Sequence, residues 1–434
     1  MRKILSYIVV VFFIITISIN GVACSKVTKT DSKVDSNNEE VTLKFIWWGN
    51  DQRKQLTQNA IELFQKKHPN VKFETKSVVS TTDIKAELAM NTADENMPDI
   101  IQGNYDYVHN YANRNLFESL NKYVEQKSLD LSDIDKACLE GGYDNGQLYG
   151  LTWGINAYCI AANKLIFEKA GVDIPKSGYT YDELYETLKK LKSEIKDADF
   201  YPLANFVDFN TFVRSMGGTY FSESGTSLGY DKDQIFIDYF KTYKKWLDEG
   251  LIAPNEITYK NTLMTSGKSA LWWGVSNQVS GLSKLAKTVL PIISVPSATK
   301  GKITSCIRPS MFLSVSAYSK HKKEAVEFIN FLTNDLEAND ALKGDRGVPT
   351  SSKASDNMEQ KATEADKQQY ILLKYIKENP SPKDPVTPTT SGNVNSLFAR
   401  ISEEILNGKS IPEDAAKKFR TDANKILNGA KGAE

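Results

Sequence analysis

The 434-residue sequence contains only three histidines and four cysteines, and its 54 Lys and Arg balance its 54 Asp and Glu. The three cysteines beyond residue 24 are an odd number without CxxC spacing, which argues against a zinc centre or a disulfide framework and allows one bridge at most. We therefore expect no metal and no cofactor. Balanced charge gives no field that attracts nucleic acid, and it favours a neutral ligand.

Motifs of nucleophilic, zinc-dependent or nucleotide-dependent catalysis are also missing. The chain has no G-x-S-x-G, no HExxH and no P-loop, because Gly267-Lys268-Ser269 follows Thr262 where a P-loop needs glycine. The histidines, His68, His109 and His321, lack metal spacing and are expected on the surface. With 54 acids, a carboxylate pair for glycoside hydrolysis stays open. We expect no enzyme, with a secreted glycan-active hydrolase as the alternative.

The N-terminus has the three parts of a secretory signal peptide. Arg2 and Lys3 precede an apolar run over residues 7–19, too short for a membrane span, and then Gly21-Val22-Ala23-Cys24. This stretch resembles a lipobox, with Gly21 in place of the usual Leu, Val or Ile. It predicts a signal peptide at 1–23, an acylated (palmitate-bearing) Cys24, and a polar tether over 24–40 that spans about 20 Å. The protein would be exported and anchored to the outer face of a bacterial cytoplasmic membrane.

The rest of the chain predicts an α/β fold in two domains, since it is too long for one core. A strand, a helix and a strand follow each other at 42–47, 56–64 and 71–74, which is typical of a parallel sheet, and a second such series begins near Cys159. The capping box Thr180-Tyr181-Asp182-Glu183 starts a helix there. Further elements are expected at 83–90, 98–102, 163–169, 233–249, 270–273, 289–295, 311–315, 322–333, 394–406 and 412–430.

The tripeptide Trp-Trp-Gly occurs twice, at Trp47-Trp48-Gly49 and at Trp272-Trp273-Gly274, each at the carboxyl end of a predicted strand. Successive strand residues face opposite ways, so one Trp of each pair enters a core and the other lies at the strand end, where parallel sheets bind ligands. Burial of both pairs is the alternative. We assign Trp48 and Trp273 to the ligand cleft.

Several segments, in this order, resemble the extracellular solute-binding proteins of ABC importers, in particular the sugar-binding group to which maltose-binding protein belongs. They are FIWWGNDQRKQLTQNAIELFQKKHPNVKFE (45–74), MPDIIQGNYDYVHNYANRNLFESL (97–120), GQLYGLTWGINAYCIAANKLIFEKAGVDIP (146–175), SALWWGVSNQ (269–278) and GDRGVPTS (344–351). The resemblance implies a periplasmic-binding-protein-like fold: two lobes with central sheets flanked by helices, joined by hinge strands, with the ligand cleft between.

The resemblance also implies where the lobes divide and which residues bind ligand. The N-terminal lobe would comprise 41–155 and 308–350, the C-terminal lobe 156–307 and 351–434, with crossings near 155–160, 306–309 and 348–351. Asp99 is expected to be structural, and a carboxylate of several relatives is replaced by Asn156. The implied ligand-binding residues are Trp48, Asn50, Asp51, Asn104, Tyr105, Asp106, Trp153, Asn156, Trp273, Asn277, Gln278, Arg308 and Arg346.

Such a set suits a sugar, because indole stacks on the apolar face of a pyranose while acids, amides and guanidinium groups bind its hydroxyls. We expect a monomeric, lipid-anchored receptor that closes over a sugar or oligosaccharide and delivers it to the membrane permease subunits of an ABC importer. It would touch the membrane through its lipid anchor only and bind no nucleic acid. A surface adhesion protein is a further alternative.

Overall fold

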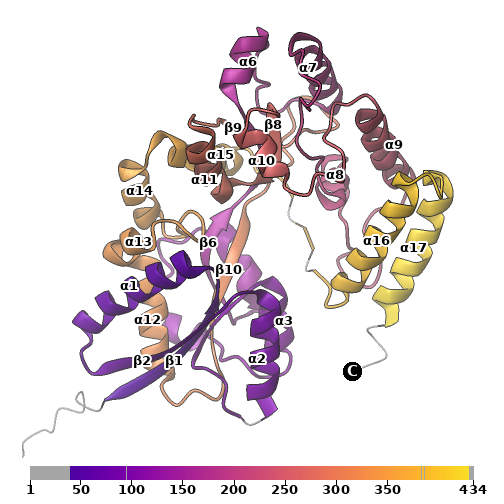
Figure 1. Cartoon of the computed structure of the whole chain (residues 1–434). Coiled ribbons are helices and arrows are strands. Elements are labelled where there is room, and N and C mark those ends of the chain that lie inside the picture. The colour runs from indigo at the N-terminus through magenta and orange to yellow at the C-terminus, as the bar shows by residue number, and fades with distance from the viewer. Residues whose placement is uncertain (1–39, 94, 383, 386, 430–434) are drawn as a thin grey trace, which may run out of the picture. The chain divides into compact units, whose positions relative to one another are not determined.

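The computed structural model describes residues 40–93, 95–382, 384–385 and 387–429 (Figure 1). The predicted signal peptide, Cys24 and the tether up to residue 39 lie outside the described residues. The described chain forms a five-stranded and a three-stranded sheet with helices packed around them, and a small two-stranded hairpin, and this confirms the α/β, two-lobed fold. We call the elements around the five-stranded sheet the first lobe and those around the three-stranded sheet the second lobe.

The first lobe is built on a sheet with the strand order β2-β1-β3-β10-β6. β1 is parallel to β2 and β3, as the strand-helix-strand pattern predicts, and β10 is antiparallel to β3 and β6. Asp99, just before β3, is structural as expected: its carboxylate accepts hydrogen bonds from the Lys44 amide (2.7 Å) and the Ser319 hydroxyl (2.6 Å). The strands are β1 Val41–Trp48, β2 Val71–Val78, β3 Ile100–Gly103, β6 Leu151–Asn156 and β10 Arg308–Val315.

Alternation along β1 places its side chains in two separate cores. Phe45 and Trp47 pack in the core beneath α1 and α12, whereas Ile46 packs in the core beneath α2 and α3, and Figure 1 shows these helices on opposite faces of the sheet. The buried Trp47 therefore fits the predicted strand phase. The first lobe's helices and hairpin are α1 Asp51–Lys67, α2 Thr81–Ala93, α3 Tyr105–Ala112, α4 Asn121–Glu125, α5 Lys136–Leu139, η1 Glu140–Gly142, β4 Tyr143–Asp144, β5 Gln147–Leu148, α12 Lys322–Asn334 and α13 Leu336–Leu342.

The second sheet corrects the sequence-based prediction. We expected a second parallel series, but β7 (Tyr158–Ala162) is antiparallel to both of its neighbours, β8 (Leu271–Val275) and β9 (Ile292–Ile293). β6 and β7 belong to different sheets and are separated by Ala157 alone, so β7 enters the second sheet directly from the first. Hydrophobicity carries no strand direction, so the pattern gave no sign of this arrangement. The strand expected over 289–295 shrinks to two residues.

Helices complete the second lobe. The capping box forms as predicted: the Thr180 hydroxyl accepts from the Glu183 amide (3.1 Å), and the Glu183 carboxylate accepts from the Thr180 amide (3.0 Å). The pattern did not predict α8, α10, α11, α14 or α15. The helices of this part of the chain are α6 Lys164–Ala170, α7 Tyr181–Glu194, α8 Phe209–Ser215, α9 Gln234–Asp248, α10 Lys260–Thr265, η2 Ser276–Gln278, α11 Val279–Ala286, α14 Ser352–Lys361, α15 Glu364–Glu378, α16 Ser391–Leu406 and α17 Pro412–Gly429. Of these, α14 packs against α12 and α13 of the first lobe and against α15.

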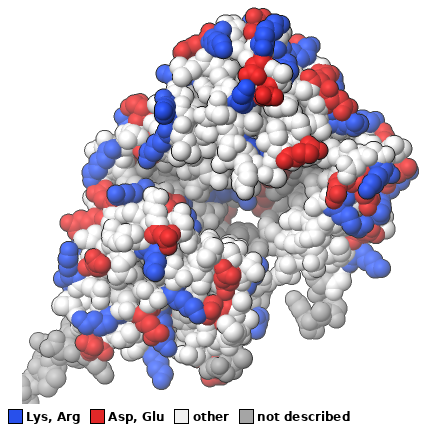
Figure 2. All heavy atoms as spheres, viewed as in Figure 1, with Lys and Arg blue, Asp and Glu red and all other residues white. Residues whose placement is uncertain are grey.

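The surface is charged but mixed. In the face shown in Figure 2, basic and acidic side chains alternate over both lobes without a large patch of one sign, in keeping with the balanced composition. Within the described residues, no helix combines the length and apolarity that a membrane crossing requires.

Candidate functional site

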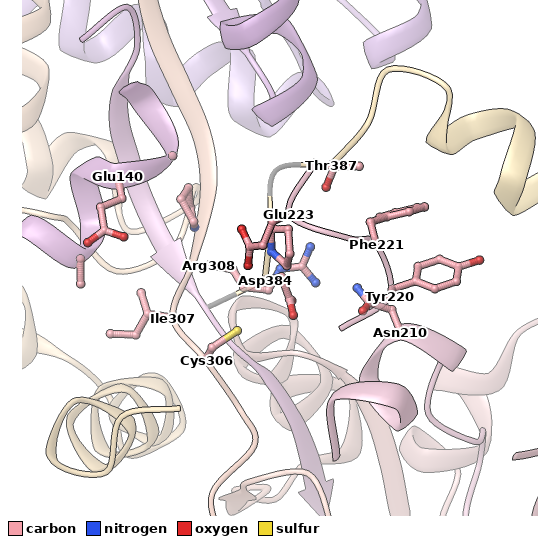
Figure 3. A pocket seen from close by; sticks show the side chains of 14 residues that line it. Glu140, Asn210, Tyr220, Phe221, Glu223, Cys306, Ile307, Arg308, Asp384 and Thr387 are labelled. Carbon is pink, nitrogen blue, oxygen red and sulfur yellow. The ribbon is translucent and has the colours of Figure 1, made fainter. Parts of the chain in front are cut away.

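A cavity of about 360 Å³ lies where β10 begins, and four other segments line it. Figure 3 shows Glu140 on one side, and Tyr220 and Phe221, from the loop after α8, on the other. The cavity therefore joins side chains far apart in the sequence. The lining residues are Ala137, Glu140, Gly141, Asn210, Tyr220, Phe221, Glu223, Cys306, Ile307, Arg308, Pro309, Asp384, Pro385 and Thr387.

Arg308 is the one predicted ligand-binding residue, among those with described side chains, that lines this cavity. Its guanidinium carbon lies 4.4 Å from the centre of the Tyr158 ring, and that ring packs against Trp273 with centroids 5.1 Å apart. A cation–π contact of this kind holds a guanidinium in place, and the group carries five N–H donors for hydrogen-bond acceptors. Trp273 is thus connected to the cavity through Tyr158 and Arg308.

Hydrogen-bonding groups of both kinds line the cavity. Glu140, Glu223 and Asp384 contribute carboxylates, and Asp384 is paired with Arg214 at 2.6 Å. The side-chain oxygen of Asn210 is buried and has no hydrogen-bond partner among the described residues. Since an unpaired buried acceptor costs about 1–3 kcal/mol, a hydroxyl donor bound in the cavity would be stabilised at this atom.

Two aromatic rings form an apolar wall beside these polar groups. The rings of Tyr220 and Phe221 lie 4.5 Å apart, and each residue is only 7% exposed. Burial raises the pKa of the Tyr220 hydroxyl, which therefore stays a neutral hydrogen-bonding group. The combination of rings, carboxylates, an amide and a guanidinium suits a compact ligand with both C–H faces and hydroxyls.

Asp208 adds a buried acid behind the cavity. It caps α8 by accepting a hydrogen bond from the Thr211 amide at 2.6 Å. Burial raises the pKa of the Asp208 carboxyl above its ordinary value, while the Thr211 hydrogen bonds and the charge of Arg308 oppose the rise. The electrostatic state of the Arg308 region therefore depends on this acid.

The predicted residues at the end of β1 lie in a different place. Trp48 is half-buried, and its carbonyl accepts long hydrogen bonds from Gln102 (3.4 Å) and Arg53 (3.4 Å). Asn50 caps α1 by accepting from the Arg53 amide at 2.9 Å, and Asp51 is exposed in the first turn. Asn50 thus has a structural role in α1.

The next predicted group begins α3. Asn104 is at the N-cap position, and its side-chain oxygen is buried without a hydrogen-bond partner among the described residues. Tyr105 and Asp106 are the first residues of the helix, and their side chains lie outside what the structure describes. Asn104 therefore retains an acceptor for a ligand hydroxyl.

Arg346, Trp153 and Asn156 lie inside the first lobe. Arg346 is 2% exposed and lies 4.1 Å from the Trp153 ring centre. Its Nη2 donates to the Thr57 hydroxyl (2.6 Å) and to the side-chain amide oxygen Oε1 of Gln102 (3.3 Å). Burial, followed by the charge of Arg53, lowers the pKa of Arg346 to about 9, so it is charged at neutral pH. Its contacts join the segment after α13 to the strand ends.

Asn277 and Gln278 lie on a separate groove of about 350 Å³, together with Trp272 and the start of α11. Gln278 accepts a hydrogen bond from the Val275 amide at 3.4 Å. The predicted set is therefore divided among the end of β1, the start of α3, the interior of the first lobe, this groove and the cavity that Arg308 lines.

Sequence reasoning missed most of the cavity wall. Tyr220 and Phe221 follow the Gly217-Gly218 break. Asp384 lies in the Pro-rich segment over residues 380–391 (PSPKDPVTPTTS), whose composition predicts only a loop. An aromatic pair after a glycine break was the available signal; Glu140, Asn210 and Glu223 had none.

The described residues contain no group of three or more His, Cys, Asp or Glu side chains that could hold a metal ion. No disulfide joins Cys138, Cys159 or Cys306 among the described residues. Cys306 lines the cavity, and burial raises the pKa of its thiol, which keeps it protonated at neutral pH.

Fold and cavity together define a two-lobed binding protein. The model of the bacterial extracellular solute-binding protein family matches residues 49–337, and the chain belongs to this family. This confirms the resemblance on which the sequence-based predictions relied.

Solved structures agree over nearly the whole chain. An extracellular solute-binding protein of family 1 from Alicyclobacillus acidocaldarius is 25% identical, with 90% of this chain and 99% of that chain covered and a TM-score of 0.74. A periplasmic oligogalacturonide-binding protein from Yersinia enterocolitica, in complex with digalacturonic acid, is 23% identical (90% and 100% covered, TM-score 0.75). The GacH receptor of Streptomyces glaucescens, described unliganded and with acarbose, is 18% identical (89% and 98%, TM-score 0.73).

Proposed function

We propose that the protein is a receptor for a sugar or oligosaccharide and that it binds this ligand in the cavity at the start of β10. The observation that carries the proposal is the convergence of Arg308, the Tyr220-Phe221 wall and the carboxylates of Glu140, Glu223 and Asp384 on one cavity. Similarly folded proteins that bind oligogalacturonide and acarbose support a carbohydrate ligand.

The chemistry of the cavity fits a pyranose. Its C–H face stacks on an aromatic ring, and its hydroxyls donate to carboxylates and accept from a guanidinium group. Micromolar affinity corresponds to about −8 kcal/mol, which several such contacts supply after the cost of ordering the site.

Isothermal titration calorimetry, after a thermal-shift screen of mono- and oligosaccharides, tests the proposal. Saturable binding that weakens in Glu223→Gln, a change that keeps the shape and removes the charge, supports a receptor at this cavity. The same variant tests the alternative of a glycan-active hydrolase, which would release reducing ends from an oligosaccharide and lose that activity in Glu140→Gln or Glu223→Gln. Absence of binding across the screen would contradict the proposal.

The receptor would capture its ligand by closure of two lobes, 41–155 with 308–350 against 156–307 with 351–434. A ligand that contacts both lobes binds the closed state more tightly and shifts the population toward it. Small-angle scattering should then give a smaller radius of gyration with saturating sugar than without it. Superimposable curves would argue against closure.

The receptor would be exported and anchored through an acylated Cys24, from where it delivers sugar to the permease subunits of an ABC importer as a monomer. A polar tether without acyl chains has no affinity for lipid, so Cys24→Ser should release the protein from the membrane fraction into the medium. Unchanged retention of the variant would contradict the anchor but leave sugar binding untouched.

A further inference from the structure

Arg214 joins three separate segments at the edge of the cavity. It lies on α8, its side chain is 9% exposed, and its Nε donates to the Thr304 carbonyl at 2.7 Å. Its Nη1 donates to Asp384 at 2.6 Å, and its Nη2 donates to the Ser381 hydroxyl at 2.9 Å and to the Pro382 carbonyl. One guanidinium thus bonds to the segment that precedes β10 and to three residues of the Pro-rich segment.

Both segments held by Arg214 lead directly into the cavity wall. Thr304 lies two residues before Cys306, the first residue of the segment 306–309 that lines the cavity. Asp384, Pro385 and Thr387 of the Pro-rich segment also line the cavity. Arg214 itself does not line this cavity, although it borders the small adjoining one of about 10 Å³ with Asp384 and Arg308. Its effect on a ligand would therefore be indirect.

Among its described residues, the Pro-rich segment has few hydrogen bonds besides those from Arg214. Prolines at 380, 382, 385 and 388 have no N–H, and they exclude helix and strand pairing across the segment. Among the described residues, regular backbone bonding resumes at Pro388, whose carbonyl accepts from the Ser391 amide at 2.9 Å. The position of Asp384 thus depends on side-chain contacts, and Arg214 makes the ion pair among them.

We propose that Arg214 is a positioning residue that fixes the Pro-rich segment against the start of β10 and so holds the Asp384 side of the ligand site in place. This inference rests on the proposed sugar site. It concerns a residue that the family resemblance did not assign and that contacts the cavity wall rather than the cavity.

The geometry requires arginine. A guanidinium presents five N–H donors in a fixed plane and can serve Thr304, Asp384 and Pro382 at once, whereas a lysine ammonium is a compact charge on a flexible stem. Arg214→Lys therefore keeps the positive charge beside Asp384 but loses the planar set of N–H donors, and Arg214→Ala loses both the charge and the donors. The two variants separate charge from positioning.

The first measurement needs no sugar. Hydrogen exchange followed by mass spectrometry on the whole mature protein should show roughly tenfold faster exchange over residues 381–391 in Arg214→Ala and a smaller rise in Arg214→Lys, read at the Ser391 amide, because that amide is bonded to the Pro388 carbonyl and opens when the segment loosens. Leu188→Ala is the matched control: Leu188 is fully buried in α7, away from the cavity lining, so the change lowers stability without loosening this segment.

The second measurement is calorimetric titration with the strongest binder from the screen. Arg214→Ala should weaken binding roughly tenfold to hundredfold, Arg214→Lys less, and Leu188→Ala by less than about twofold below its melting temperature. Asp384→Asn added to Arg214→Ala should cost little more than either change alone, since both disturb one contact. A merely structural Arg214 would behave like Leu188.

The outcomes are distinguishable. Unchanged hydrogen exchange over residues 381–391 in Arg214→Ala contradicts the inference that Arg214 fixes the Pro-rich segment. If hydrogen exchange is faster in Arg214→Ala but its affinity for sugar is unchanged, Arg214 fixes the segment, but the segment does not hold the ligand. This outcome overturns the inference and leaves the proposed function unaffected. If the wild-type protein binds no sugar, the proposed function fails and the inference fails with it, whatever the exchange shows.

Discussion

The same tripeptide, Trp-Trp-Gly, ends β1 in the first lobe and lies in β8 in the second, and the two copies have different surroundings. In both, the first Trp is buried, Trp47 at 1% and Trp272 at 7% exposure, and the second, Trp48 or Trp273, is half-buried. The shared feature is the strand alternation. The two copies differ in the side chain that lies beside the glycine and in the residues that the second Trp contacts.

Each glycine makes room for a side chain of the protein itself. A Cβ on Gly49, whose φ is +152°, would lie 2.2 Å from Cδ of Arg53, and a Cβ on Gly274 would lie 1.8 Å from the ring of Trp272. In the first copy the glycine admits a neighbouring arginine at a strained turn. In the second it admits the indole two residues earlier on the same face of the strand.

The second tryptophans differ in what they reach. Trp48 packs against the cores on both faces of the first sheet, and its carbonyl bonds to Gln102 and Arg53. Trp273 packs on Tyr158, which lies under Arg308 at the cavity, and Asn205 bonds to both its backbone N–H and its carbonyl. The repeated motif therefore predicts the burial of its first Trp, whereas the surroundings of the second Trp depend on the lobe.

The largest expected effect tests what the two copies share. Trp47→Ala and Trp272→Ala should each destabilise the protein by about 3–5 kcal/mol, because truncating a buried indole leaves a cavity in the core. Urea unfolding followed by far-UV circular dichroism measures this. A loss below about 1 kcal/mol for either variant would mean that its partner, and not it, is the core residue.

This part of the molecule was predictable from sequence because it depends on local period alone. The alternation of β1 identified Trp47 as core, and Thr180 with Glu183 identified the start of α7. The direction of β7 was not predictable, because antiparallel and parallel pairing bury the same residues.

The cavity was unpredictable for a related reason. Arg214 and Asp384 are 170 residues apart in the sequence. Their contact joins helix α8 to a segment whose sequence has neither helical nor strand periodicity. Arg308 was found through family resemblance, and the Tyr220-Phe221 wall was not. Sites made by loops need tertiary contacts that no local pattern encodes.

The next effect tests the difference between the two copies. Trp273→Ala should weaken sugar binding by about 1–3 kcal/mol, because Tyr158 and Arg308 lose the ring that supports them. Trp273→Phe is the control, since it keeps an aromatic surface under Tyr158 and should retain most of the affinity. Titration calorimetry on both variants measures the effect. If Trp273→Ala binds the sugar as tightly as the wild type, Trp273 does not support the cavity through Tyr158 and Arg308.

Trp48→Ala should have a smaller effect on binding, less than about 1 kcal/mol, because Trp48 does not line the cavity at β10. The same titration, with the same sugar, decides between the two copies. A loss as large as that of Trp273→Ala would show that the end of β1 belongs to the ligand site after all, and would return Asn104, whose side-chain oxygen has no partner among the described residues, to the set of ligand contacts.

The smallest effect concerns buried charge, which differs in sign between the two regions: Arg346 in the first lobe and Asp208 beside Arg308 in the second. Burial raises the pKa of Asp208 above 3.8, so the folded state binds its proton more tightly than the unfolded state does. This acid's contribution to stability therefore falls as pH rises from 3.8 through the folded-state pKa. Asparagine caps helices as well as aspartate and does not titrate, so Asp208→Asn should gain in urea midpoint relative to the wild type as pH rises through that window.

Asp130→Asn is the control with the opposite sign. Hydrogen bonds from Ser132 lower the pKa of Asp130, so its contribution is present above pH 3.8 and lost as pH falls, and the variant should lose midpoint relative to the wild type as pH rises. Urea midpoints of the three proteins between about pH 2 and 7, in steps of about half a unit, cover the window below pH 3.8 for Asp130 and the window above it for Asp208, and so give both slopes. Parallel curves for the wild type and Asp208→Asn would mean that Asp208 is as well solvated in the folded protein as in the unfolded chain, and the charge contrast between the two regions would then rest on Arg346 alone.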